Sequence, residues 1–340
     1  MTTQNRPSIQ DLKSLYTTAI DFRDFSCWDW MDDTDIIGIQ NPTTEEIGYC
    51  CVIGANREMF GLIVYLGTEG LDSYNRILSD RSKNTNSIFY QKCLIISFEN
   101  KNVLEKADLD TIKSLGLNIR GSYAYPMCRE YTPGFYPWFI APDQIQFLTL
   151  CLQQVKEVAG RFKENKEILF SDNKNEYLVR ALRTVQNCVE WQDMWVQPKR
   201  VKKNVSYLSR IPHDQLDEIK SKYRLVNVSW EFDCSYSFNP IQDKKNTRPY
   251  YPRLLMCVDK ASEFILQTKL IANGDIVIEC HLELIKAIQQ IGMIPQTIEV
   301  MDKEYYNILL PITSSLGIDL QLVKNLKVVR KIKRDIEKYI

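Results

Sequence analysis

Histidine is nearly absent from this chain of 340 residues, since only His213 and His281 occur, far apart in the sequence. This scarcity excludes a zinc site built on several histidines and a metalloprotease helix that carries two of them. We expect His213 to lie near a helix start and His281 to lie on the surface of an amphipathic helix. Neither position favours a catalytic role.

Several patterns that carry chemistry are missing as well. The chain has no G-x-G-x-x-G, no G-x-x-x-x-G-K-[ST] and no G-x-S-x-G, so nucleotide-binding folds and hydrolase elbows lose their usual support. No apolar stretch approaches the roughly 20 residues that span a bilayer, and residues 1–10 lack the apolar region of a signal peptide. We therefore expect a soluble, cytoplasmic protein that does not act at a membrane.

The composition is that of an ordinary globular protein without net charge. Lys plus Arg and Asp plus Glu both number 43, so a polyanion could be attracted only by a local patch. Ten cysteines include no C-x-x-C pair, and several lie in apolar runs, which predicts buried thiols in a reducing compartment. The length favours two domains, each with its own core.

Residues 1–197 read as a mixed α/β domain. Helical spacing and a proline in the first turn predict a long helix from about Pro142 to Lys163. Predicted strands cover residues 48–53, 60–66, 93–98, 176–185 and 188–196, and predicted helices cover residues 9–22, 71–78 and 108–115. Residues 198–224 then form a basic linker with a short helix, for which a solvated surface and a nucleic-acid patch are the two interpretations.

Residues 225–340 show a more specific order of elements. The pattern predicts strands at residues 225–238, 253–259 and 264–271, a helix to Ile291, a strand at 297–301, a helix at 304–316, a strand at 318–323 and a final helix at 326–340. Together with the W-x-x-D pattern of Trp230 and Asp233, this order resembles the ribonuclease H-like core of integrases and transposases. The resemblance implies an α+β domain with a five-stranded mixed sheet and flanking helices.

The resemblance also implies where catalytic acids would lie. Such cores bind two divalent ions, Mg²⁺ or Mn²⁺, between acids on the first strand, after the fourth strand and on a later helix. Asp233 matches the first position, Asp302 is nearest to the second, and Glu337, with Asp335 beside it, is nearest to the third. The family's D-N-G is missing, and alignment of the fourth strand puts Met301 where the second acid belongs, on the opposite face to Asp302.

A second resemblance concerns the whole chain. The Gly48-Tyr49 strand, the loop P-G-x-x-P-W-F from Pro133 to Phe139 and the run R-P-Y-x-P-R from Arg248 to Arg253 are similar to an uncharacterised two-domain bacterial family. That family implies no activity. Aromatic side chains at Trp28, Trp30, Tyr136 and Trp138 are the candidates for contact with a partner, although aromatic residues also pack in cores.

Two functions from different classes follow. In the first, the chain is a non-catalytic binding or scaffold protein with a degenerate ribonuclease H-like domain, whose partner is a protein or a nucleic acid. In the second, it is a Mg²⁺- or Mn²⁺-dependent nuclease or strand-transfer enzyme that uses Asp233, Asp302 and Glu337, the first two as metal ligands. The missing D-N-G favours the first. The final helix is rich in lysine and arginine, which suits either a solvated face or a phosphate-binding one.

Overall fold

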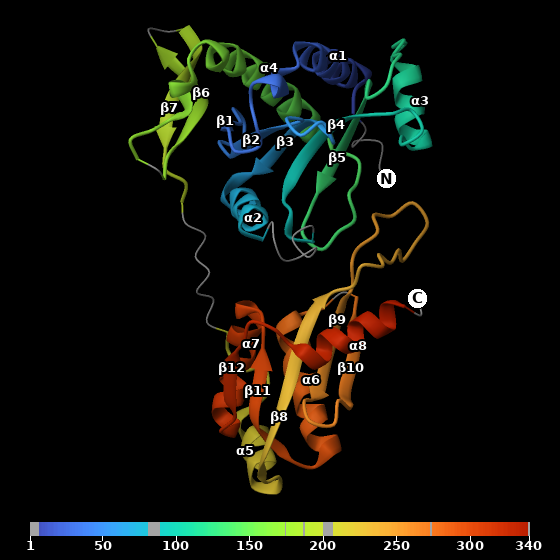
Figure 1. Cartoon of the computed structure of the whole chain (residues 1–340), viewed down its shortest axis with the longest axis vertical. Helices are drawn as coiled ribbons and strands as arrows, with labels where there is room; N and C mark the ends of the chain where they lie inside the picture. Colours follow the sequence, from blue (N-terminus) through green and yellow to red (C-terminus); the bar gives the residue numbers. More distant parts are fainter. Residues whose placement is uncertain are drawn as a thin grey trace. The chain divides into compact units, whose positions relative to one another are not determined.

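The protein is described by a computed structural model at residues 7–80, 89–173, 175–185, 188–199, 207–272 and 274–338. The chain divides into two compact units, Met1–Val201 and Lys202–Ile340. Part of the predicted basic linker, residues 200–206, lies outside the described residues, as does the predicted turn Gln186-Asn187. Each unit has its own β-sheet (Figure 1). Each also has its own hydrophobic core.

The first unit is built on a seven-stranded sheet with the order β5-β4-β3-β2-β1-β6-β7. Its strands are β1 (Ile36–Gln40), β2 (Ile47–Ile53), β3 (Phe60–Leu66), β4 (Cys93–Glu99), β5 (Tyr125–Tyr131), β6 (Tyr177–Val185) and β7 (Cys188–Val196). Neighbouring strands are antiparallel except β1 and β6, which pair in parallel. The sheet is therefore mixed.

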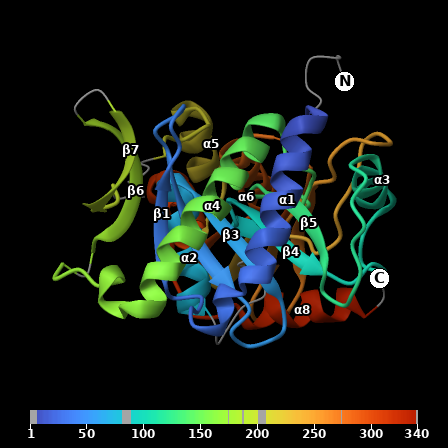
Figure 2. The ribbon, with the colours of Figure 1, turned by 90° about the horizontal axis from the view of Figure 1, so that it is seen from above.

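Helices cover both faces of this sheet. The long helices α1 (Ile9–Phe25) and α4 (Pro142–Glu164) lie side by side on one face, and α2 (Gly67–Asp80) lies on the other (Figure 2). Successive side chains of a strand point to opposite faces of the sheet. Cys50 and Val52 therefore belong to the core under α1 and α4, whereas Tyr49 belongs to the core under α2. The smaller elements are α3 (Lys106–Ser114) and the 3₁₀ turns η2 (Cys27–Asp29) and η4 (Lys166–Leu169).

The second unit contains a five-stranded sheet with the order β10-β9-β8-β11-β12. Its strands are β8 (Leu225–Tyr236), β9 (Arg253–Asp259), β10 (Ile265–Ile271), β11 (Ile294–Val300) and β12 (Asp319–Leu322). β8, β9 and β10 are antiparallel, while β11 is parallel to β8 and β12 is parallel to β11. This is the ribonuclease H-like strand order, so the predicted fold class is confirmed.

The helices of the second unit fall on opposite faces of its sheet. Their bounds are α5 (His213–Lys222), α6 (Ile276–Ile291), α7 (Lys303–Leu316) and α8 (Lys327–Glu337). Alternate residues of β8, Trp230, Phe232 and Cys234, are buried in the core under α6 and α7. α8 covers the other face with a smaller apolar cluster that includes Met256 and Val329. The residues of β8 between those core positions therefore point toward α8.

Some local expectations needed correction. Strands β1 and β5 were not predicted, and β5 ends at Tyr131, where the aromatic loop begins. His281, expected on a helix surface, is fully buried: its Nε2 lies 2.6 Å from the carbonyl oxygen of Ile308, and its Nδ1 accepts a hydrogen bond from the backbone N–H of Arg210. α6 is packed against α7 there, so its histidine lies inside the core.

All ten cysteines lie within the described ranges and are free, and nine of them are buried. Among the described helices, none is long and apolar enough to cross a membrane.

Candidate functional site

The face of β8 that points toward α8 carries two acids, Glu231 and Asp233, which are 0% and 8% exposed. Both lie between core residues in the sequence, and the pleat of the strand turns them away from that core. A buried carboxylate must find a hydrogen bond or a cation, because its transfer out of water is costly. The contacts of the two acids therefore decide what this face of the sheet can do.

Asp233 is paired with a lysine from α8. The Nζ atom of Lys333 donates to Oδ2 of Asp233 and also to the hydroxyl of Ser235, which follows on the same face of β8. Only 11% of the Asp233 side chain and 23% of the Lys333 side chain are exposed. The ammonium group of Lys333 thus lies beside Oδ2 of Asp233 and offsets its charge.

Glu231 caps the N-terminus of α8. Its Oε2 atom accepts hydrogen bonds from the backbone N–H groups of Val328 and Val329, at 3.0 and 2.8 Å. The first N–H groups of a helix have no partner within the helix and carry partial positive charge, so a carboxylate stabilises them. Glu231 therefore fixes α8 on the sheet, and this role was not anticipated from the sequence.

Glu299 lies opposite Glu231 on the neighbouring strand β11. Its Oε1 atom is 2.5 Å from Nζ of Lys260, and the residue is 9% exposed. Like Asp233, this acid is neutralised by a lysine. Lys260, in the turn after β9, and Lys333, in α8, thus offset two of the carboxylates on this face.

Asp302 contacts the start of a helix, whereas a metal site would need it beside other acids. It is the N-cap of α7, where Oδ1 accepts a hydrogen bond from the backbone N–H of Glu304 at 2.7 Å. The register of β11 against β8 ends at Glu299, which lies opposite Glu231, and β11 itself ends at Val300, so Met301 and Asp302 follow the strand. Met301 packs against the apolar cluster under α8. Met301 thus lies on the α8 side of the sheet, while Asp302 caps α7.

The third predicted acid, Glu337, is the last residue of α8, and its side chain lies outside the described part of the chain. Its neighbour Asp335 is exposed and forms an ion pair of 3.0 Å with Lys338. Within the described ranges, no group of three or more His, Cys, Asp or Glu side chains could hold a metal ion. A metal site formed by Asp233, Asp302 and Glu337 stays a prediction.

The cysteines of this unit are poor candidates for nucleophiles or metal ligands. Burial raises the pKa of the Cys257 thiol well above its ordinary value. The pKa of Cys280 is also raised, by a hydrogen bond with the thiol of Cys234 and by burial. Only the thiolate is strongly nucleophilic, so these side chains remain protonated and act as core residues.

Two of the aromatic contact candidates are packed within the first unit. Trp28 is 7% exposed and contacts the ring of Phe98 at a centroid distance of 5.8 Å. Trp30 is half-buried, donates from Nε1 to the carbonyl oxygen of Ala159 at 2.9 Å, and lies under the ammonium group of Lys163. These contacts leave Trp28 with little surface for a partner.

The other two candidates lie in the loop after β5. Tyr136 is 41% exposed, while Trp138 is half-buried and is held to Glu130 by two backbone hydrogen bonds of 2.7 and 3.0 Å. Phe139 meets the ring of Trp138 edge to face and lies under the guanidinium of Arg129. The loop therefore presents exposed aromatic surface on a fixed backbone.

Two family models match the chain. Residues 13–180 match a domain of unknown function, DUF7309. Residues 215–337 match a second domain of unknown function, DUF6930. Neither description assigns an activity, and no curated protein matches the chain.

Some of the solved structures that resemble part of the chain come from T-cell lymphotropic viruses or contain an integrase core. The catalytic core domain of the HTLV-2 integrase in complex with magnesium aligns at 17% identity and a TM-score of 0.26, over 34% of this chain and 70% of that chain in its dimeric form. A simian T-cell lymphotropic virus intasome in complex with the PP2A regulatory subunit B56 gamma aligns at 20% identity and the same TM-score, over 34% and 40%. Similarity at this level says nothing about activity, and the fold assignment rests on the strand order.

Proposed function

We propose that this chain is a non-catalytic binding protein whose second unit keeps the ribonuclease H-like fold without using it for metal chemistry. The ion pair between Asp233 and Lys333 is the observation that carries this proposal. The positively charged lysine repels a divalent ion, and its ammonium group already satisfies the carboxylate that the ion would need. Metal binding would require this shielded pair to separate first.

The surroundings of Asp233 support the same function. Two-metal catalysis needs acids from separate elements that converge on both ions. Here Glu231 is bound to the start of α8, Glu299 to Lys260 and Asp302 to the start of α7, so each acid already serves the fold. Each of these contacts engages one carboxylate oxygen, so a metal ion would have to compete for it.

The aromatic loop of the first unit is the surface that we propose for binding. Tyr136 and Phe135 are each 41% exposed on a backbone fixed at Trp138. Exposed aromatic side chains on a rigid loop provide contact area at little cost in conformational entropy. A protein partner or a nucleic acid would suit this surface. We also propose a cytoplasmic location, which the free cysteines support, and membership of a two-domain bacterial family.

A cleavage assay tests the non-catalytic function. The full chain is incubated with single-stranded DNA, duplex DNA and RNA in Mg²⁺ or Mn²⁺, beside Asp233→Asn and the control Glu263→Gln, which changes an exposed acid that pairs with Lys331. We expect no cleavage above background from any of the three proteins. Cleavage that depends on Mn²⁺, persists in Glu263→Gln and is lost in Asp233→Asn would establish the nuclease instead.

A further inference from the structure

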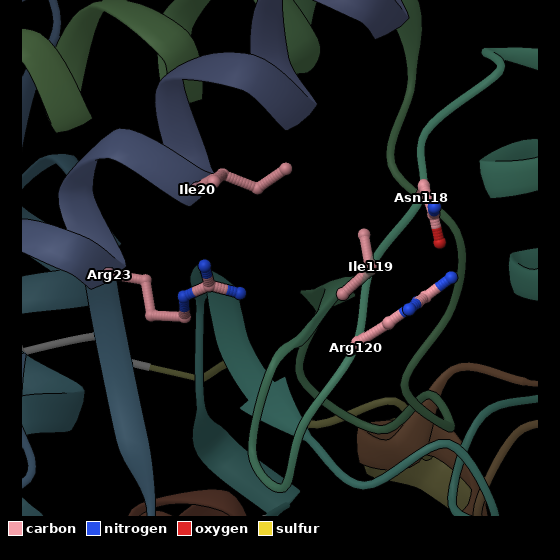
Figure 3. A pocket seen from close by; sticks show the side chains of 5 residues that line it. All are labelled: Ile20, Arg23, Asn118, Ile119 and Arg120. Carbon is pink, nitrogen blue, oxygen red and sulfur yellow. The ribbon is translucent and has the colours of Figure 1, made fainter.

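A cavity of about 430 Å³ lies in the first unit, between α1 and the segment that follows α3. Figure 3 shows Ile20 and Arg23 on the α1 side, and Asn118, Ile119 and Arg120 on the other. Its volume is within the range of cavities that bind small molecules. None of these five described residues is acidic, and three of them carry N–H donors.

The wall on the α1 side is fixed by hydrogen bonds. Arg23 donates to Oδ1 of Asp24 from Nε and Nη2, at 2.9 and 2.7 Å, and from Nη1 to the carbonyl oxygen of Ala124 at 2.8 Å. Only 23% of the Arg23 side chain is exposed. The guanidinium is therefore held in one orientation, so little conformational entropy is lost when a ligand binds to it.

The opposite wall holds donors that the fold does not use. Its backbone is anchored because the Tyr125 hydroxyl donates to the carbonyl oxygen of Ile119 at 2.9 Å. The side chains of Asn118 and Arg120, in contrast, make no hydrogen bond or ion pair with any described residue, and both are exposed. Arg120 alone offers five N–H donors in a planar fork that suits carboxylate and phosphate oxygens.

The charges and the apolar side chains define the ligand. Asp24 offsets Arg23, so Arg120 leaves the cavity with an excess of one positive charge. Donors outnumber side-chain acceptors, while Ile20 and Ile119 add apolar contacts. We propose that this cavity binds a small molecule that carries a terminal oxyanion, a phosphate or a carboxylate, with Arg120 as the main contact. The inference concerns the first unit and does not rest on the function proposed above.

Titration calorimetry on the full chain tests this site with three probes at equal ionic strength: inorganic phosphate, ribose 5-phosphate and succinate. Arg120→Gln should weaken binding about tenfold or more, because it removes a charge-assisted contact. Arg120 is exposed and unpaired, so this variant should fold as the parent does. Arg57→Gln is the control, since it removes the same charge from an arginine that is 63% exposed and pairs with Asp29.

The outcomes separate the ligand classes. Binding of ribose 5-phosphate and phosphate but not succinate assigns a phosphate site, and the reverse assigns a carboxylate site. Either result supports the proposal only if Arg120→Gln weakens binding and Arg57→Gln does not. If no probe binds the full chain at millimolar concentration, or if both variants weaken binding equally, the proposed site is refuted. The cleavage assay is unaffected by either result.

Discussion

At the scale of single residues, the buried acids and the buried His281 of the second unit serve the fold through hydrogen bonds and ion pairs. Glu231 is the clearest case, because it is fully buried and accepts from two N–H groups at the start of α8. Glu231→Ala removes this acceptor, so two buried backbone N–H groups, those of Val328 and Val329, lose their hydrogen-bond partner. We expect the free energy of unfolding to fall by about 2 kcal/mol, measured by urea denaturation.

Glu263→Gln is the matched control for that measurement. Glu263 contacts Lys331 on the outer side of the same helix, and the two side chains are 47% and 54% exposed. An exposed ion pair contributes little, so this variant should change the unfolding free energy by less than about 0.5 kcal/mol. Equal losses in the two variants would contradict a capping role for Glu231.

We expect His281 to make the stability of the fold depend on pH. Burial lowers its pKa below the ordinary value of 6.5, and the nearby charge of Arg210 acts in the same direction, while the hydrogen bond to Ile308 opposes the shift. Below about pH 6.5 the unfolded chain binds a proton that the folded chain does not. The free energy of unfolding should therefore fall as the pH is lowered, by at most about 1.4 kcal/mol per pH unit from this residue.

Urea denaturation from pH 7.5 to 5 measures this dependence. The slope below pH 6.5 should be smaller in His281→Gln, whereas His213→Gln, which changes the exposed histidine of α5, should keep the slope of the unaltered chain. An unchanged slope in His281→Gln would show that other groups cause the dependence.

The local pattern W-x-x-D marked Asp233 as a candidate metal ligand. No local pattern marked Glu231 as the acid that caps α8. The partners of Glu231 lie 97 and 98 residues later in the chain. In the sequence, Glu231 is only an acid between Trp230 and Phe232, as on any half-exposed strand. The available signal was that Glu231 lies between apolar residues on a strand that is covered on both faces. A carboxylate in such a place needs a hydrogen-bond partner or a cation.

At the scale of elements, α8 was predicted with nearly its observed bounds, but the partner of each of its cations was not. Val329 and Ile332 face the sheet, and Lys333 follows Val329 by four residues, so it lies at the edge of the same stripe. The methylene groups of Lys333 can thus pack along the apolar residues while its ammonium group reaches Asp233.

A double-mutant cycle tests the contact between α8 and β8. Asp233→Asn and Lys333→Met should each destabilise the fold, because each leaves a shielded partner unpaired. We expect the double variant to be more stable than the sum of the two losses predicts, with a coupling energy of about 1–3 kcal/mol from urea denaturation. Strictly additive losses would mean that the two side chains do not interact.

The missed strands β1 and β5 have separate physical reasons. β1 has only five residues and pairs in parallel with β6, about 140 positions later, where a Cβ on Gly38 would come within 2.6 Å of the Val179 side chain. β5 includes Pro126 and the buried Arg129, which is paired with Asp108 of α3. β1 also pairs with the nearby β2, and it is buried on both faces, so it lacks the apolar–polar alternation that marks a half-exposed strand. In β5 the proline and the charged residues hide the strand pattern.

At the scale of the whole molecule, the chain contains 43 basic and 43 acidic residues, and some of these side chains form ion pairs within the fold. The strand and helix order of the second unit was readable from the sequence, since each element has strong periodicity. Whether the carboxylates of this unit form an open metal site was not readable from the sequence, because it depends on which lysine reaches which acid. That question decides whether the molecule binds a metal.

Binding of Mn²⁺ to the full chain, followed by the electron paramagnetic resonance signal of free Mn²⁺, tests the central claim most directly. Because Lys333 neutralises Asp233, we expect no stoichiometric site in the unaltered chain, and the same titration curve for Asp233→Asn. Retention of one or two Mn²⁺ ions per chain, with loss of that binding in Asp233→Asn, would contradict the non-catalytic function.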